Sequence, residues 1–99
     1  MKLREIAYSR SGDKGSDSNI GVIAMSEKEY AYLVEKLTAE KVQEFFAPLN
    51  PVKTVRYELP NLHALNFVIE GILAEGGSRS LRIDAQGKVL GQAILEMEI

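Results

Sequence analysis

The segment from Arg10 to Asn19 carries the side chains best suited to bind a ligand. Glycines within it allow the backbone to approach a ligand closely. Serine hydroxyls and backbone N–H groups can form an anion-binding nest, and the two cations can neutralise a phosphate or a carboxylate. The candidate ligand-binding residues of this segment are Arg10, Gly12, Asp13, Lys14, Gly15 and Asn19.

Two familiar kinds of binding loop fit this segment poorly. Its spacing differs from the G-x-x-x-x-G-K-[ST] of a P-loop, and we expect a strand rather than a helix to follow it. Asp13, Asp17 and Asn19 alternate around Gly15 as in a calcium loop, but the bidentate glutamate that such a loop requires is missing. An anion or acyl-group site, a metal site and a plain hairpin loop remain as alternatives.

A second candidate binding residue is Arg79, which follows Gly76-Gly77. In the strand that we predict over 78–84, Arg79 shares its parity with the core-facing Leu81 and Ile83. A buried arginine needs a partner, because an uncompensated buried charge costs about 3–5 kcal/mol. Asp13 or Asp17, a bound anion and water at the sheet margin are the candidates. The alternative is an exposed arginine at the frayed end of the strand.

A third group of polar residues lies in a helix that we predict over 61–73. The helix is apolar almost all round, and His63, Asn66 and Glu70 form a narrow stripe at i, i+3 and i+7. The only histidine of the chain and a glutamate on one face could act as a general base and the residue that orients it. The alternative is a solvated stripe, since every amphipathic helix has a polar face. One histidine cannot form a two-histidine metal site.

Composition excludes several classes of function. The chain has 99 residues, no cysteine and a formal net charge of −2. Disulfides, thiolate metal sites and cysteine nucleophiles are therefore excluded, and we expect no cofactor. Basic residues are scattered, which argues against nucleic-acid binding. Because no signal peptide and no apolar run of roughly 18 residues is found, we expect no membrane partner and a cytoplasmic protein.

The order of predicted elements indicates one α+β domain over residues 1–99. A capping box at Ser26 and Glu29 opens a helix, and Thr38 caps a short one. We expect a ferredoxin-like sandwich or a variant of it, with a mainly antiparallel sheet of about four or five strands and the helices on one face. The helices would be two long ones and one short one, and the strands would lie at 2–9, 20–25, 52–59, 78–84 and 88–98.

The other face of this sheet is expected to be apolar. It would show Ile23, Met25, Leu90 and Ile94. Such a face is usually covered. With the helices on the opposite side, a second copy of the chain is the simplest cover, so we predict a homodimer or a partner protein on this face.

Several blocks of residues, in order along nearly the whole chain, resemble the AtuA-like domain of acyclic-terpene-utilisation proteins. They are Arg10–Gly15, Asn19–Val22, Glu58–Leu62, Ala64–Phe67, Ser78–Asp84 and Gly87-Lys88.

The resemblance implies a ferredoxin-like fold. It also implies an accessory role beside a large partner protein, in the breakdown of branched acyl-CoA or terpenoid-type compounds. It carries no catalytic residue to this chain, so we expect the isolated chain not to be an enzyme. The alternative functions are a stand-alone anion- or acyl-CoA-binding module that uses the segment 10–19, and a small enzyme that uses His63.

Overall fold

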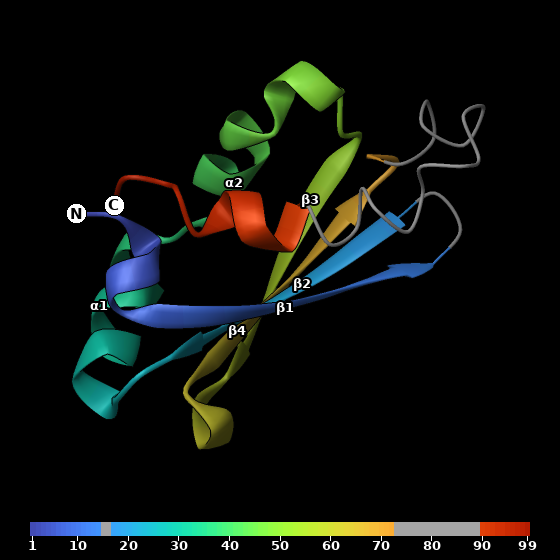
Figure 1. Ribbon diagram of the computed structural model, residues 1–99. Helices are drawn as coiled ribbons and strands as arrows, with labels where there is room; N and C mark the ends of the chain where they lie inside the picture. Colours follow the sequence, from blue (N-terminus) through green and yellow to red (C-terminus); the bar gives the residue numbers. More distant parts are fainter. Residues whose placement is uncertain (15–16, 73–89) are drawn as a thin grey trace.

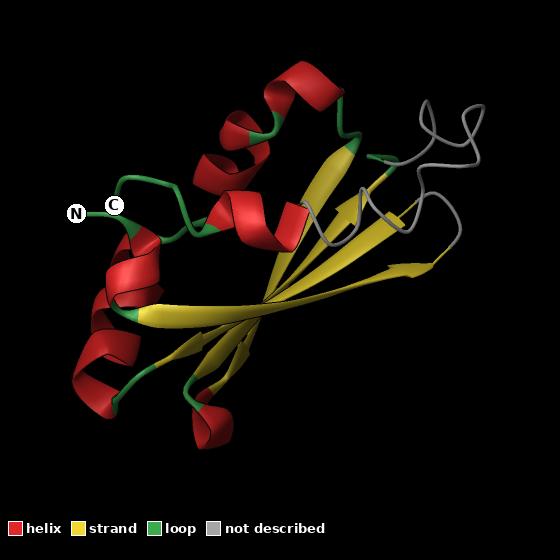
Figure 2. Cartoon of the chain, viewed as in Figure 1, coloured by secondary structure: helices red, strands yellow, loops and turns green. Residues whose placement is uncertain are grey.

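The computed structural model describes residues 1–14, 17–72 and 90–99. The chain alternates short helices and strands around one sheet (Figures 1 and 2). Its elements are η1 (Leu3–Glu5), β1 (Ala7–Lys14), β2 (Asp17–Ala24), α1 (Glu27–Lys36), α2 (Ala39–Phe45), η2 (Ala47–Leu49), β3 (Lys53–Leu59), η3 (Pro60–Leu62) and β4 (Ala64–Glu70), followed by a helix at 90–94.

Within the described residues, the sheet has four antiparallel strands in the order β1-β2-β4-β3. Its register places Ser9, Val22 and Leu65 side by side across three strands. Because side chains alternate between the faces of a strand, this register fixes one face as the side that packs on the helices. The predicted α+β class with an antiparallel sheet and helices packed on it is confirmed.

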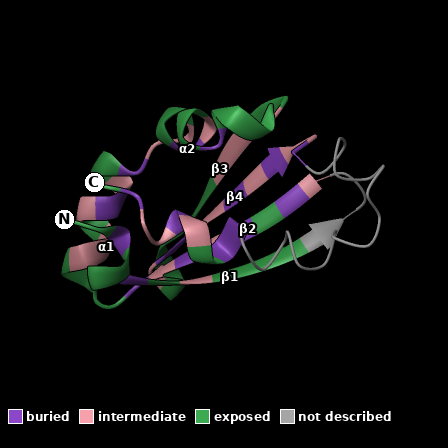
Figure 3. Cartoon of the chain, turned by 45° about the horizontal axis from the view of Figure 1, so that its top comes forward, coloured by how far each residue is buried: buried purple, intermediate pink, exposed green. Residues whose placement is uncertain are grey.

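The core lies between this face and the helices (Figure 3). Along β2 every second residue is buried, from Ser18 through Ile20 and Val22 to Ala24. Leu33 of α1 and Val42 of α2 are fully buried in the same cluster as Ile20, Val22 and Ala24. Burial of apolar area contributes about 25 cal/mol per Å², so this layer supplies most of the stability of the fold.

The first hairpin is longer than the sequence predicts. We expected strands at 2–9 and 20–25 with a loop between them, but β1 and β2 pair from Ala7↔Ala24 to Lys14↔Asp17. The segment lacks large apolar side chains, which is why it resembles a loop. An edge strand tolerates such a composition because backbone hydrogen bonds to its neighbour hold it in place.

The predicted helix over 61–73 is wrong, because residues 64–70 form the inner strand β4. Leu65, Phe67 and Ile69 face the helices and are fully buried, whereas the intervening Asn66 and Val68 are half-buried. A strand with apolar residues on both faces resembles a buried helix in sequence. Strands on both sides of β4 supply the hydrogen bonds that decide between the two.

The predicted strand over 88–98 is also wrong within the described residues. Residues 90–94 form a helical turn, in which Leu90 and Ile94 are both buried. This turn touches β1, since Ser9 Oγ donates a hydrogen bond of 2.6 Å to the Gly91 carbonyl oxygen. A Cβ atom at Gly91 would lie 2.7 Å from Ser11 Oγ, so a larger residue there would force the Ser11 side chain to move. The predicted strand at 78–84 lies outside the described residues.

Helix ends follow the sequence closely. Ser26 Oγ accepts a hydrogen bond from the Glu29 N–H, and Thr38 Oγ1 accepts one from the Lys41 N–H. These are the two predicted N-caps. At the other end of α1, Arg56 of β3 donates 2.9 Å hydrogen bonds to the carbonyl oxygens of both Val34 and Leu37. The guanidinium thereby satisfies carbonyl groups that a helix end leaves without a partner.

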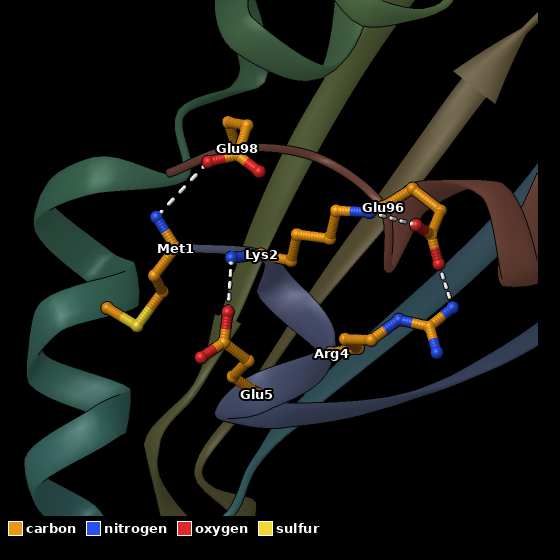
Figure 4. A network of polar contacts seen from close by, with 6 residues as sticks. All are labelled: Met1, Lys2, Arg4, Glu5, Glu96 and Glu98. Atoms are coloured by element: carbon orange, nitrogen blue, oxygen red, sulfur yellow. Dashed lines mark hydrogen bonds and ion pairs between the residues drawn. The ribbon is translucent and has the colours of Figure 1, made fainter.

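The two ends of the chain lie side by side (Figure 4). The Leu3 N–H donates a hydrogen bond of 2.9 Å to the Met97 carbonyl oxygen, and the backbones of Lys2 and Glu98 form an isolated antiparallel β-bridge. Around these backbone contacts, Glu96 pairs with both Lys2 and Arg4. Within the described part of the chain, no helix is long and apolar enough to cross a membrane.

Candidate functional site: a groove on the outer face of the sheet

We call the side of the sheet that is turned away from the described helices the outer face. Strand register arranges its residues in rows that run across β1, β2, β4 and β3. The rows are Tyr8–Ile23–Ala64–Leu59, Arg10–Gly21–Asn66–Tyr57 and Gly12–Asn19–Val68–Val55.

A cavity of about 510 Å³, which we call the groove, lies on this face and is lined by residues from all three rows. A volume of this size is typical of small-molecule sites. Most of the lining comes from β1, β2 and β4, and Leu59 and Leu62 close one end. The lining residues are Arg10, Ser11, Gly12, Asn19, Gly21, Ile23, Leu59, Leu62, Ala64, Leu65 and Asn66.

The polar part of the groove is centred on Gly21. Arg10 and Asn66 are its two cross-strand neighbours, so a charged and an amide side chain flank a position that has no side chain. A Cβ atom at Gly21 would lie 3.8 Å from Asn66 Oδ1. Asn19 lies one row further, opposite Gly12. Within the described ranges, no hydrogen bond or ion pair engages the side chains of Arg10, Asn19 or Asn66.

The apolar part of the groove lies at the end of β4 nearest η3. Ile23, Ala64 and Leu59 are neighbours across three strands. Leu59 is 41% exposed and Leu62 is 65% exposed. The lining of the groove therefore changes along the strands from polar to apolar. This arrangement suits a molecule with one charged end and one apolar end.

The structure brings together only some of the predicted ligand-binding residues. Arg10, Gly12 and Asn19 line the groove, and Asn66 joins them from the predicted polar stripe. The backbone of Asp13 and Lys14 continues β1, but their side chains lie outside the described residues, as do Gly15 and Arg79.

Asp17 has a structural role that the sequence did not reveal. Its carboxylate accepts a 2.8 Å hydrogen bond from the Gly71 N–H, just after β4. Gly71 has φ of 77°, and a Cβ there would come within 2.6 Å of Val52 Cγ2. Asp17 therefore holds a tight exit from β4 in place.

The predicted stripe of His63, Asn66 and Glu70 is not formed. His63 ends η3 in the left-handed conformation, and its ring lies 6.0 Å from that of Tyr30. Asn66 and Glu70 share the outer face but are four residues apart on an extended strand, or about 13 Å. His63 and Glu70 therefore cannot act as a base and its orienting group, because the predicted helical spacing does not exist.

Sequence reasoning missed Gly21, Leu59 and Leu62 as lining residues. Gly21 lies inside an otherwise apolar strand, and an isolated glycine in such a place signals a close approach by another group. Leu59 and Leu62 flank Pro60 and Asn61, a turn signal. Large apolar residues beside a turn are the sequence signal that could have indicated an exposed apolar surface at this end of the groove.

Tyr30 is the one described group whose pKa is clearly shifted, and it lies on the helix side of the sheet. Burial raises the pKa of its phenol, the nearby Glu58 carboxylate raises it further, and Arg56 partly offsets both. Its hydroxyl is buried and finds no hydrogen-bond partner among the described residues. In the same part of the chain, no group of three or more His, Cys, Asp or Glu side chains could hold a metal ion.

Comparison with known families gives one match. The family model described as the AtuA ferredoxin-like domain matches residues 1–99. No curated protein and no solved structure matches the chain significantly. The match covers the whole chain and agrees with the resemblance of its motifs.

Proposed function

The chain belongs to the AtuA ferredoxin-like domain family, and from that premise we propose that it is an accessory domain that works with a larger partner protein. Its fold class is as predicted, an α+β ferredoxin-like domain with a four-stranded antiparallel sheet. The resemblance of its motifs implies a setting in the breakdown of branched acyl-CoA or terpenoid-type compounds.

The observation that carries this proposal is the set of large apolar side chains exposed on and beside the outer face. Tyr8 is 61% exposed, Tyr57 is 52% exposed, and Leu62 is 65% exposed. Contiguous exposed apolar surface is typical of interaction sites, whereas isolated exposed residues are common on any protein. Tyr57 and Leu59 lie in adjacent rows on β3, and Leu59 and Leu62 line the same groove, so these three residues form one apolar cluster at the β3 edge. Tyr8 lies on β1 at the opposite edge of the sheet, three strand spacings or about 14 Å from Leu59.

Pulldown of the tagged chain from its source cells tests the proposal, with a pair of matched variants. Leu62→Asp places a charge on the outer face, and Leu49→Asp makes the same change on η2, where Leu49 is exposed. We expect a larger protein to be recovered with the unmodified chain and with Leu49→Asp, and to be lost with Leu62→Asp. Recovery of the chain alone, or equal loss with both variants, would contradict the proposal.

Self-association is the competing use of the outer face. Two of the residues from which the homodimer was predicted, Leu90 and Ile94, lie in the core instead, so they cannot form a dimer contact. Ile23 does lie on the outer face. Sedimentation equilibrium distinguishes the two uses. If the apparent mass of the chain rose from that of a monomer to that of a dimer with increasing protein concentration, and if Leu62→Asp weakened this association, the face would be assigned to a second copy.

A further inference from the structure

We propose that the groove binds a small monocarboxylate with an aliphatic tail. The carboxylate would contact Arg10 and the side-chain amides of Asn19 and Asn66, and the tail would lie over Ile23, Leu59 and Leu62. This site needs only the residues of one chain, although it shares Leu59 and Leu62 with the surface proposed for the protein partner.

The charge of the groove selects an anion. Among the described residues that line the groove, Arg10 is the only charged one. No described carboxylate pairs with the Arg10 guanidinium, so its donors are available for a ligand. A guanidinium matches a carboxylate with two parallel hydrogen bonds, and the amide groups of Asn19 and Asn66 add further donors. One cation balances one negative charge, which favours a monocarboxylate over a phosphate group or a coenzyme with several phosphates.

The floor of the groove leaves room for the carboxylate. Gly21 lies between Arg10 and Asn66 in register, and Gly12 lies beside Asn19. Nothing lies within 4 Å of a Cβ atom placed at Gly12, and ordinary contacts of 3.8 Å surround one placed at Gly21. Two neighbouring positions without side chains therefore form a notch below the three polar groups.

The length of the apolar part limits the tail. The row of Ile23, Ala64 and Leu59 is two residues along the strands from the row of Arg10, which corresponds to about 7 Å. Leu62 extends the apolar surface beyond that row. A tail of about five carbons spans this distance, and burying it contributes roughly 0.8 kcal/mol per methylene at most.

Titration of the full chain with sodium hexanoate, followed by ¹H–¹⁵N correlation spectra, tests the site. We expect the backbone signals of Gly21, Ile23 and Asn66 to shift. Hexanamide has the same tail without the charge, and acetate has the charge without the tail. Each should bind at least about fivefold more weakly, because a charge-assisted hydrogen bond and several buried methylenes are removed.

Three variants locate the binding. Arg10→Gln should weaken hexanoate binding at least about fivefold, and Gly21→Val should abolish it by filling the notch. Lys53→Gln is the matched control, because it removes the same charge from the outer face outside the groove lining. Its affinity should equal that of the unmodified chain.

The proposal would be overturned if hexanamide bound as well as hexanoate, if Arg10→Gln changed nothing, or if the shifted signals lay elsewhere. Folded spectra of each variant exclude unfolding as the cause of lost binding. Failure here leaves the proposed protein partner untouched, because the pulldown uses a different readout and a different variant.

Discussion

At the scale of single residues, Tyr30 shows how burial couples to pH. Its hydroxyl is buried without a described partner, and burial and Glu58 both hold its pKa above the ordinary value of 10.0. The unfolded chain therefore loses the Tyr30 proton at a lower pH than the folded chain does. Stability from this difference is fully present below pH 10 and is lost as the pH rises from there through the folded pKa.

We predict that Tyr30→Phe flattens the alkaline loss of stability. At pH 7 the variant should be within about 1 kcal/mol of the unmodified chain, because a buried hydroxyl without a partner contributes little. Between pH 9 and 11 its free energy of unfolding, measured by urea denaturation, should fall less than that of the unmodified chain. Tyr8→Phe is the control, because Tyr8 is 61% exposed. Equal pH slopes for both variants would contradict the prediction.

The sequence indicated which residue types could line the groove, but it did not reveal how these residues are arranged in space. Arg10, Gly12 and Asn19 were predicted as ligand-binding from their chemistry, and the structure places all three in one lining. Asn66 was singled out on a helical spacing that does not exist. It joins the groove because β4 pairs with β2 and sets Asn66 opposite Gly21, a contact 45 residues distant in sequence. Such a pairing leaves no local signal.

At the scale of elements, caps were predictable and inner strands were not. Ser26 and Thr38 cap their helices through contacts within three residues, so sequence contains the whole cause. The identity of β4 depends on hydrogen bonds to two strands that lie elsewhere in the chain. Residues 64–70 have apolar side chains at both parities, and tertiary context decides between helix and strand in such a segment.

The exit from β4 gives a prediction for one element. We expect Gly71→Ala to lower the free energy of unfolding by about 2 kcal/mol or more, since alanine resists a φ of 77° and its Cβ would meet Val52 Cγ2 at 2.6 Å. Chemical denaturation measures the loss. Gly21→Ala is the control, because its Cβ meets only contacts of 3.8 Å.

A second substitution separates the two causes of this loss. Val52→Ala removes the Cγ2 atom that the new methyl group would strike. In combination with Gly71→Ala it should restore part of the stability, leaving the cost of the backbone conformation. If Gly71→Ala and Gly21→Ala were equally stable, the tight exit from β4 would be disproved.

At the scale of the whole molecule, the two chain ends complete the fold together. Backbone hydrogen bonds join Leu3 to Met97 and Arg4 to Leu95, each over 2.9 Å, and Leu3 is fully buried beneath them. The ion pairs in Figure 4 surround this contact at the surface. Surface pairs contribute about 0–1 kcal/mol each. Most of the stabilisation must therefore come from buried Leu3 and Met97.

We predict that removal of residues 97–99 lowers the midpoint of thermal unfolding by at least about 8 °C. Met97 is 5% exposed, and loss of a buried methionine side chain costs about 2–5 kcal/mol. For a domain of this size each kcal/mol corresponds to about 4–8 °C. Glu98→Gln, which removes only an exposed ion pair with Met1, should shift the midpoint by no more than a few degrees. If the truncated chain and Glu98→Gln had the same midpoint of thermal unfolding, the joined ends would be a surface contact that the packing of the core does not require.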